Sequence, residues 1–134
     1  MVCNSNNYVV LGQVDAINYT MSSLQALTQA NSVRLVRSTV SSDPKKINDL
    51  DEDSRTALHW ACSTSNYEIV EILTGYDECG VDIKDGAGWT ALMIAASVGN
   101  DDILKRLIEK GANVNETSSS GQSALYVLAF EIQS

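Results

Sequence analysis

Residues Arg55–Asn66 read RTALHWACSTSN, and a closely similar stretch, WTALMIAASVGN, returns at Trp89–Asn100. The two stretches start 34 residues apart and share a threonine, two alanines, a leucine and a serine at matching places. Each is followed by acidic residues and then by a second apolar run. Self-similarity at this period predicts pairs of helices that stack and bury their apolar sides against one another.

The same period divides most of the chain into repeated units. They comprise residues 21–50, which are degenerate, residues 51–84 and 85–117, which are complete, and residues 118–134, which are partial. We therefore expect one all-α solenoid over residues 21–134. Residues 1–20 are rich in asparagine and have no clear period, so we predict a poorly ordered N-terminal extension.

Several residues predict where individual helices begin and end. Thr56 is expected to cap a first helix that runs to about Ser63, and the 34-residue period aligns Ser22 with it. Pro44, the only proline, should end the second helix of the first unit, because proline cannot continue a helix. Gly111 is expected to take the left-handed conformation after the second helix of the third unit.

The last unit stops within or just after its first helix. No second helix follows to cover Leu125, Leu128 and Phe130. Terminal repeats of stacked arrays normally have polar residues at such places. We therefore expect exposed apolar surface here, as in a truncated chain or in a protein that needs a partner at this end.

Two stretches resemble a known family: DEDSRTALHWACS at 51–63 and DGAGWTALMIAASVGN at 85–100. They are similar to ankyrin repeats and, more closely, to the gankyrin type, the non-ATPase regulatory subunit 10 family of the proteasome. The resemblance covers residues 43–128 and implies an ankyrin-repeat solenoid. It also implies a chaperone for assembly of the 26S proteasome regulatory particle, whose concave face binds the C-terminal domain of a base ATPase subunit. That family has more repeats than this chain.

The resemblance places a partner-binding surface on the loop tips, or fingers, and on the ends of the first helices. Arg55 and Trp89 occupy equivalent finger positions; by resemblance Arg55 forms a salt bridge to the partner, and Trp89 is a contact anchor. The alternatives are a solvated arginine, and tryptophans that pack against the adjacent repeat. The predicted partner-binding residues are Glu52, Asp53, Arg55, Trp60, Ser63, Thr64, Trp89, Ser97 and Val98.

The sequence contains no set of residues that predicts catalysis or metal binding. His59 is the only histidine, and we expect it to bond the neighbouring loop backbone; a catalytic or metal-binding role is the alternative. Three cysteines without a C-x-x-C pair predict neither a disulfide framework nor a zinc site, and Cys62 should lie in the core. We expect no enzyme activity and no cofactor.

Composition limits the partner and the location. Nine Lys and Arg against 17 Asp and Glu give a net charge of −8, which disfavours nucleic acid and anionic membranes as partners. The N-terminal apolar run, Tyr8–Leu11, is too short for a signal peptide, and no run reaches the roughly 18 residues of a membrane span. We expect a monomer in the cytoplasm and nucleus.

Three functional hypotheses follow. The first is a proteasome assembly chaperone that binds one ATPase subunit. The second is a general ankyrin adaptor, for example of the kind that inhibits cyclin-dependent kinases. The third is a truncated fragment without function, because about three repeats lie near the minimum for a stable stack.

Overall fold

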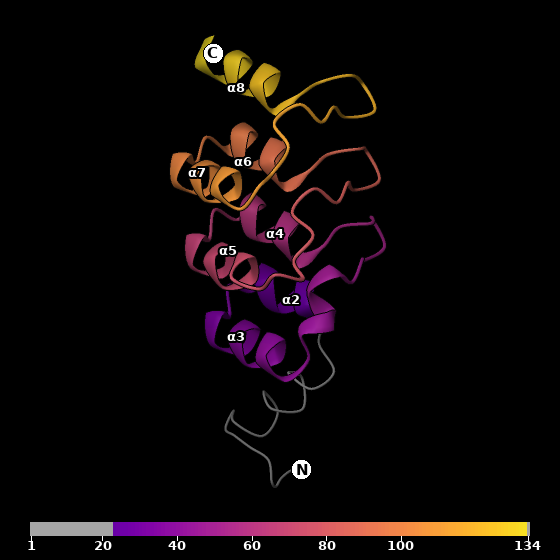
Figure 1. Ribbon diagram of the computed structural model, residues 1–134, viewed down its shortest axis with the longest axis vertical. Helices are drawn as coiled ribbons and strands as arrows, with labels where there is room; N and C mark the ends of the chain where they lie inside the picture. Colours follow the sequence, from indigo (N-terminus) through magenta and orange to yellow (C-terminus); the bar gives the residue numbers. More distant parts are fainter. Residues whose placement is uncertain (1–22, 134) are drawn as a thin grey trace, which may run out of the picture.

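The computed structural model describes residues 23–133, which fold into successive helix pairs (Figure 1). The elements are α2 (Leu24–Gln29), α3 (Val33–Ser42), the 3₁₀ helix η2 (Pro44–Asn48), α4 (Ala57–Ser63), α5 (Tyr67–Thr74), α6 (Ala91–Val98), α7 (Asp101–Glu109) and α8 (Ala124–Gln133). The predicted all-α solenoid is confirmed. The extension predicted at residues 1–20 lies outside the described residues.

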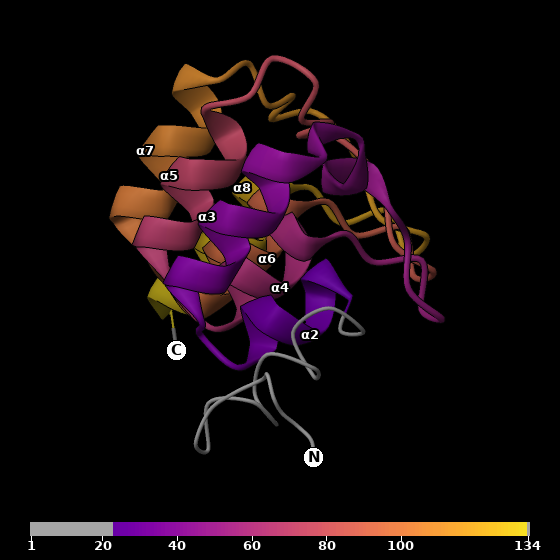
Figure 2. The same cartoon turned by 90° about the horizontal axis from the view of Figure 1, so that it is seen from below.

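The helices form two layers, with the loops on one side. Seen along the stack, α2, α4, α6 and α8 make the inner layer, while α3, α5 and α7 make the outer layer (Figure 2). The long loops that precede α4, α6 and α8 project beyond the inner layer as a row of fingers (Figure 1). We call them the second, third and fourth fingers, after the repeat units to which they belong. The inner helices and the fingers therefore share one face of the solenoid.

Hydroxyl side chains cap the inner helices. Thr56 accepts a hydrogen bond from the backbone N–H of His59, so α4 begins and ends where the sequence predicts. In the first unit the cap is Ser23 and not Ser22. The aligned buried positions still match, since Leu24 is 3 % and Leu58 is 2 % exposed. The first helix therefore starts one residue later without moving its apolar residues out of register.

The outer helices start at positions that are 34 residues apart. Asn66 and Asn100 accept hydrogen bonds from the N–H groups of Ile69 and Ile103, respectively. Helix α3 ends at Ser42, before Pro44, as predicted. The proline then begins the 3₁₀ helix η2, which we did not predict from the sequence. Gly111 has a φ of 91°, which confirms the left-handed residue expected after α7.

One continuous apolar core runs through the stack. Leucines such as Leu58 and Leu92 are almost fully buried between pairs, and Ala61 and Ala95 are 0 % exposed. Their small side chains let α4 and α6 approach closely. Because each pair contributes one side of the core, burial depends on the neighbouring pair.

Two cysteines lie within the described residues. Cys62 is 0 % exposed in the core, as predicted, and burial raises the pKa of its thiol well above the usual range. Burial also raises the pKa of Cys79 to about 11. Both are therefore protonated at neutral pH and are poor nucleophiles. Cys3 lies outside the described residues.

His59 joins two successive fingers. The imidazole is buried, its Nδ1 accepts from the N–H of Thr56 at 3.0 Å, and its Nε2 donates to the carbonyl of Trp89 at 2.9 Å. The predicted bond to loop backbone is confirmed. Gln25 does the same in the first unit, where its Nε2 donates to the carbonyl of Arg55 at 3.0 Å. The 34-residue period aligns Gln25 with His59, which is the sequence signal for this second link.

His59 should make stability depend on pH. Burial lowers its pKa below the ordinary 6.5. As the pH falls through that value, the unfolded chain takes up the proton first, so stability present above pH 6.5 is lost below it. We expect urea denaturation at pH 7.5 and 5.5 to show a lower free energy of unfolding at 5.5, by up to about 1.4 kcal/mol per pH unit below 6.5. His59→Gln keeps a donor for Trp89 and should remove this dependence; an equal slope in both proteins would refute the explanation.

Candidate functional site

The fingers that precede α4 and α6 are each a tight turn closed by one aspartate, whereas in the finger that precedes α8 the Ser118 Oγ accepts from the N–H of Gln122 at 3.2 Å. Asp51 Oδ1 accepts from the N–H groups of Asp53 and Arg55, each at 2.9 Å. Asp85 Oδ1 accepts from those of Ala87 and Trp89, also at 2.9 Å. These carboxylates satisfy backbone donors that would otherwise be unpaired in the turn. They hold the tip residues outward in fixed positions.

The fingers are also joined side by side. The N–H of Gly86 donates to the carbonyl of Asp53 at 3.0 Å, and the N–H of Ser119 donates to that of Ala87 at 3.1 Å. Gly88 has a φ of 80°, and a Cβ there would lie 2.6 Å from the nitrogen of Ser119. Only glycine allows this close approach. The fingers therefore act as one row.

A polar cluster of four side chains links the second and third fingers. Arg55 Nε donates to Asp85 Oδ2 at 3.3 Å, and its guanidinium carbon lies 5.0 Å from the centre of the Trp60 ring. Trp60 Nε1 donates to Asp51 Oδ2 at 2.7 Å. The Asp85 side chain is 4 % exposed, and that of Arg55 is 36 % exposed. Arg55 thus makes a salt bridge within the chain, and its side chain stays partly exposed. Its contact with a partner stays a prediction.

The cluster keeps Asp51 ionised. Burial raises the pKa of Asp51, but hydrogen bonds from the Trp60 indole and from the backbone N–H groups of Arg55 and Asp53 outweigh it. The net effect lowers the pKa below its usual value of 3.8. The finger therefore presents a negative charge at neutral pH.

The first groove lies between the third finger and the ends of α4 and α6. It has a volume of about 320 Å³ and is partly walled by the Arg55–Asp85 pair and by Ile94. Trp89, which also lines it, is half-buried and packs against the core, in agreement with the packing alternative. The predicted residues that line it are Arg55, Ser63, Trp89, Ser97 and Val98.

The second groove lies between α2 and the second finger. It has a volume of about 640 Å³, and Gln25, Leu50 and Asp51 contribute to its walls. The predicted residues that line it are Glu52, Asp53 and Trp60. Thr64 lines neither of these two grooves, and its hydroxyl donates to the carbonyl of Trp60 in α4.

Nine residues that line the two grooves were not predicted, among them two aspartates and two isolated apolar residues. Asp51 and Asp85 open the stretches DEDSR and DGAGW, and this shared first residue was the available signal. Leu50 and Ile94 carried no such signal, because an isolated apolar residue predicts core and surface equally well.

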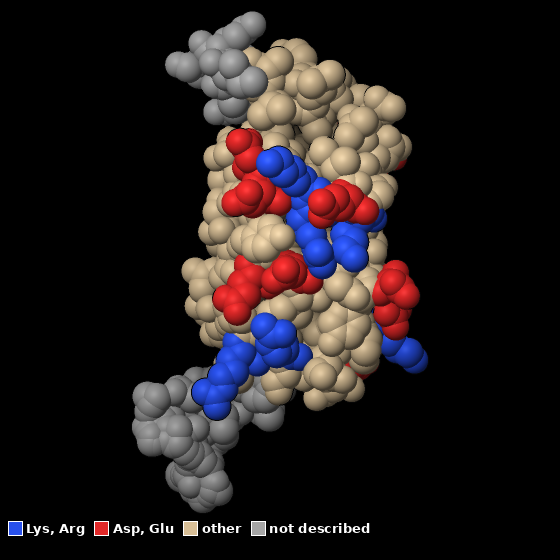
Figure 3. Space-filling model, turned by 60° about the vertical axis from the view of Figure 1, so that its left-hand side comes forward, with Lys and Arg blue, Asp and Glu red and all other residues tan. Residues whose placement is uncertain are grey.

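The opposite, outer face has mixed charge. Basic and acidic side chains alternate there (Figure 3), and Arg37 and Glu68 form a pair at 3.8 Å with both side chains 61 % exposed. Such a pair contributes only about 0–1 kcal/mol. Arg106 of α7 differs from this exposed pair, because its guanidinium donates to the Thr74 hydroxyl and the Glu71 carbonyl of α5. This arginine joins two outer helices.

Neither a metal site nor a membrane helix is present in residues 23–133. No three His, Cys, Asp or Glu side chains in this range are placed to share an ion. Its helices are also too short or too polar to cross a bilayer. The described surface instead has grooves that are lined in part by carboxylates and aromatic rings.

Comparison with known proteins agrees with this architecture. Residues 6–85 and 77–131 match the family model of ankyrin repeats, which describes three copies. The chain belongs to the ankyrin-repeat family. Its fingers, inner helices and outer helices are those of ankyrin repeats, and such repeats form protein-binding modules.

Individual relatives share only part of their length with this ankyrin-repeat chain. An ankyrin repeat-containing protein of Schizosaccharomyces pombe is 35 % identical over 99 residues, which are 70 % of this chain and 42 % of that protein. The 26S proteasome non-ATPase regulatory subunit 10 of Dictyostelium discoideum is 38 % identical over 63 residues, 47 % of this chain and 27 % of the subunit. An E3 ubiquitin-protein ligase of Arabidopsis thaliana is 37 % identical over 83 residues, 60 % of this chain and 5 % of the ligase.

The polar cluster should contribute to stability through Asp85. Asp85→Ala removes the acceptor for two finger N–H groups and for Arg55, so we expect the free energy of unfolding to fall by about 2 kcal/mol or more. Urea denaturation followed by tryptophan fluorescence measures this. Asp53→Ala, at an exposed finger tip, is the matched control and should change stability by less than about 0.5 kcal/mol. Equal losses in both variants would show that the cluster adds no stability.

Proposed function

We propose that this ankyrin-repeat chain binds a protein partner in the first and second grooves, which both lie beside the fingers. We propose further that the partner is the C-terminal domain of a proteasomal ATPase subunit. The observation that carries the proposal is the clustering of predicted residues. Eight of the nine line the two grooves. Arg55 from the first groove stacks on Trp60 from the second, so the grooves share a wall. A partner can then contact both at once.

The choice of partner rests on the sequence likeness. The 38 % identity to the proteasomal subunit of Dictyostelium discoideum supports it, as does the stretch DSRTALHWACS at 53–63. The chain spans 27 % of that relative, so the role in assembly of the whole regulatory particle is part of the proposal. The mechanism would be steric, since the bound domain stays covered until it is released.

The grooves favour a partner with basic side chains. Ionised Asp51 and exposed Glu52 and Asp53 stand together at one finger, and the whole chain has a net charge of −8. Such charge speeds the encounter with a positive partner and selects its orientation. Ser63 and Ser97 are exposed and small, so a helix or loop of the partner could approach the inner helices closely.

The second candidate is a general ankyrin adaptor. It is favoured by the similar identity, 37 %, to a ligase that bears no proteasome name. The partner distinguishes the two candidates. Affinity purification with mass spectrometry should recover a proteasomal ATPase under the first, and a kinase or another protein under the second.

Blocking the first groove should weaken capture of the ATPase domain. Ser63→Arg and Ser97→Arg place long, positive side chains at exposed positions of the groove without disturbing the core. We expect the dissociation constant, measured by calorimetry with the purified domain, to rise at least tenfold, about 1.4 kcal/mol.

Tyr67→Arg is the control for this experiment. Tyr67 is 38 % exposed on the outer helix α5 and lines neither groove, so this variant should bind like the unmodified chain. Unchanged binding by both serine variants would remove the first groove from the interface.

A further inference from the structure

The first two boundaries between successive units each have a buried polar link from an inner helix to the next finger. At the boundary between the first and second units, Gln25 Nε2 donates to the carbonyls of Asp49 and Arg55 at 2.6 and 3.0 Å. At the boundary between the second and third units, His59 Nε2 donates to the carbonyl of Trp89 at 2.9 Å. The two linking side chains are 4 % and 1 % exposed, respectively.

The third boundary, between the third and fourth units, lacks this link. Met93 stands 34 residues after His59 and is 0 % exposed, but a thioether has no proton to donate. The aligned acceptor is the carbonyl of Gln122, which precedes the serine that caps α8 as Trp89 precedes the threonine that caps α6. Among residues 23–133, this carbonyl accepts from the N–H of Ser118 at 2.8 Å and from no side chain.

Met93 also leaves a buried donor unpaired. One unit earlier, the N–H of Thr56 donates to His59 Nδ1 at 3.0 Å. At the aligned place the N–H of Thr90 has no acceptor among the described residues, although Thr90 is only 1 % exposed. A thioether is at best a weak acceptor, and a buried donor without an acceptor costs free energy. The third unit therefore lacks both bonds that the imidazole supplies to the second.

The polar contacts that do cross the third boundary lie in its loops. Lys84 Nζ donates to the carbonyl of Thr117 and pairs with Glu116 Oε1, each at 3.0 Å. The two side chains of this ion pair are 42 % and 32 % exposed, so the pair adds little stability. In the fingers, the N–H of Ser119 donates to the carbonyl of Ala87 at 3.1 Å. Apolar packing of α8 on α6 therefore holds this boundary without a buried polar link.

We propose that the third boundary is an opening point built into the solenoid, at which residues 118–133 detach as one segment while residues 23–117 stay folded. A stacked array allows this, because each unit contacts only its neighbours and the most weakly held segment opens first. Opening breaks the bond between Ser119 and Ala87, so the third finger loses support. Ala87 and Trp89 of that finger line the first groove. The opening therefore loosens one wall of this groove, whatever the groove binds.

Hydrogen–deuterium exchange of the full chain measures the opening. We expect the backbone amides of residues 124–129 to exchange at least about tenfold faster than those of α4 and α6. Met93→Gln and Met93→His each supply a donor for the Gln122 carbonyl, in the two forms that the chain uses at its earlier boundaries. Each should slow the exchange of residues 124–129 at least about fivefold. Met93→Leu keeps the site apolar at a similar volume and is the matched control, with exchange unchanged within about twofold.

The reverse substitution tests the same cause at another boundary. His59→Met gives the second boundary the defect of the third, so the amides of α6 should exchange at least about fivefold faster while those of α3 stay unchanged. This variant reports on the missing link at a place inside the stack, away from α8.

Three outcomes would overturn the proposal. The first is exchange of residues 124–129 as slow as that of α4 and α6 in the unmodified chain. The second is fast exchange that neither Met93→Gln nor Met93→His slows while circular dichroism shows the fold retained, since the opening would then come from the end of α8. The third is unchanged exchange of α6 in His59→Met.

Discussion

Burial of apolar side chains between neighbouring helix pairs is the constraint on which the whole structure depends. A pair such as α4 and α5 is too thin to enclose its own leucines, so Leu58 is buried only because further pairs stack on both sides. This explains the small residues at the contact, such as Ala61 and Ala95, which bring the inner helices close. It also explains why the position of Leu58 becomes a surface at Leu125, where no later pair follows within the described residues.

Polar links fix how the pairs are turned relative to one another. Hydrophobic contact alone has no direction, whereas each hydrogen bond between fingers allows a single register. His59 and Gln25 each reach the backbone of the next finger, and Arg55 adds a partly buried ion pair to Asp85. Two of these three side chains, Gln25 and Arg55, also line the grooves. The residues that stabilise the row of fingers are therefore also the residues that shape the surface for a partner.

Because some residues both stabilise the fingers and line the grooves, the interpretation of Arg55 and Trp60 changes. Both were predicted to bind a partner because of their positions, yet each has a partner within the chain. Their role in recognition would then be to set the walls of the grooves, with further contacts made by exposed edges. By contrast, Ser63 and Ser97, and the tip carboxylates of Glu52 and Asp53, make no side-chain hydrogen bond or ion pair among the described residues. Loss of binding on changing these residues reports on recognition without a change in stability.

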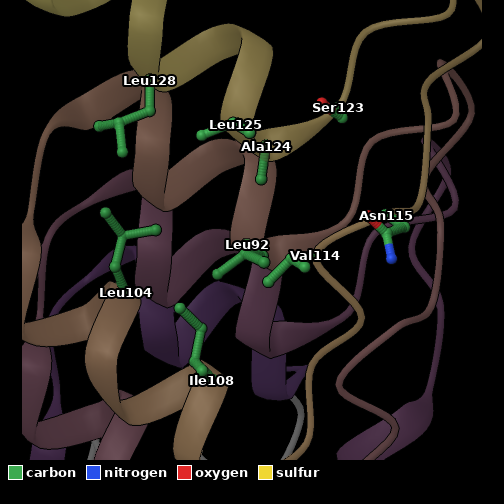
Figure 4. Close-up of a pocket in the computed structure, with 9 residues that line it drawn as sticks. All are labelled: Leu92, Leu104, Ile108, Val114, Asn115, Ser123, Ala124, Leu125 and Leu128. Carbon is green, nitrogen blue, oxygen red and sulfur yellow. The ribbon is translucent and has the colours of Figure 1, made fainter.

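The sequence by itself determined the repeat, the helix order and most boundaries, because caps, proline and the 34-residue period act over a few residues. It also indicated eight of the residues that line the two grooves, since equivalent positions in a repeat lie in one row. Only the tertiary structure decided which of them are free. The pairing of Arg55 with Asp85, which are 30 positions apart, depends on how two fingers are placed in space. No local pattern encodes that distance. The close-up of α6, α7 and α8 shows the same dependence, because Leu92, Leu104 and Leu128 come together there from three helices (Figure 4).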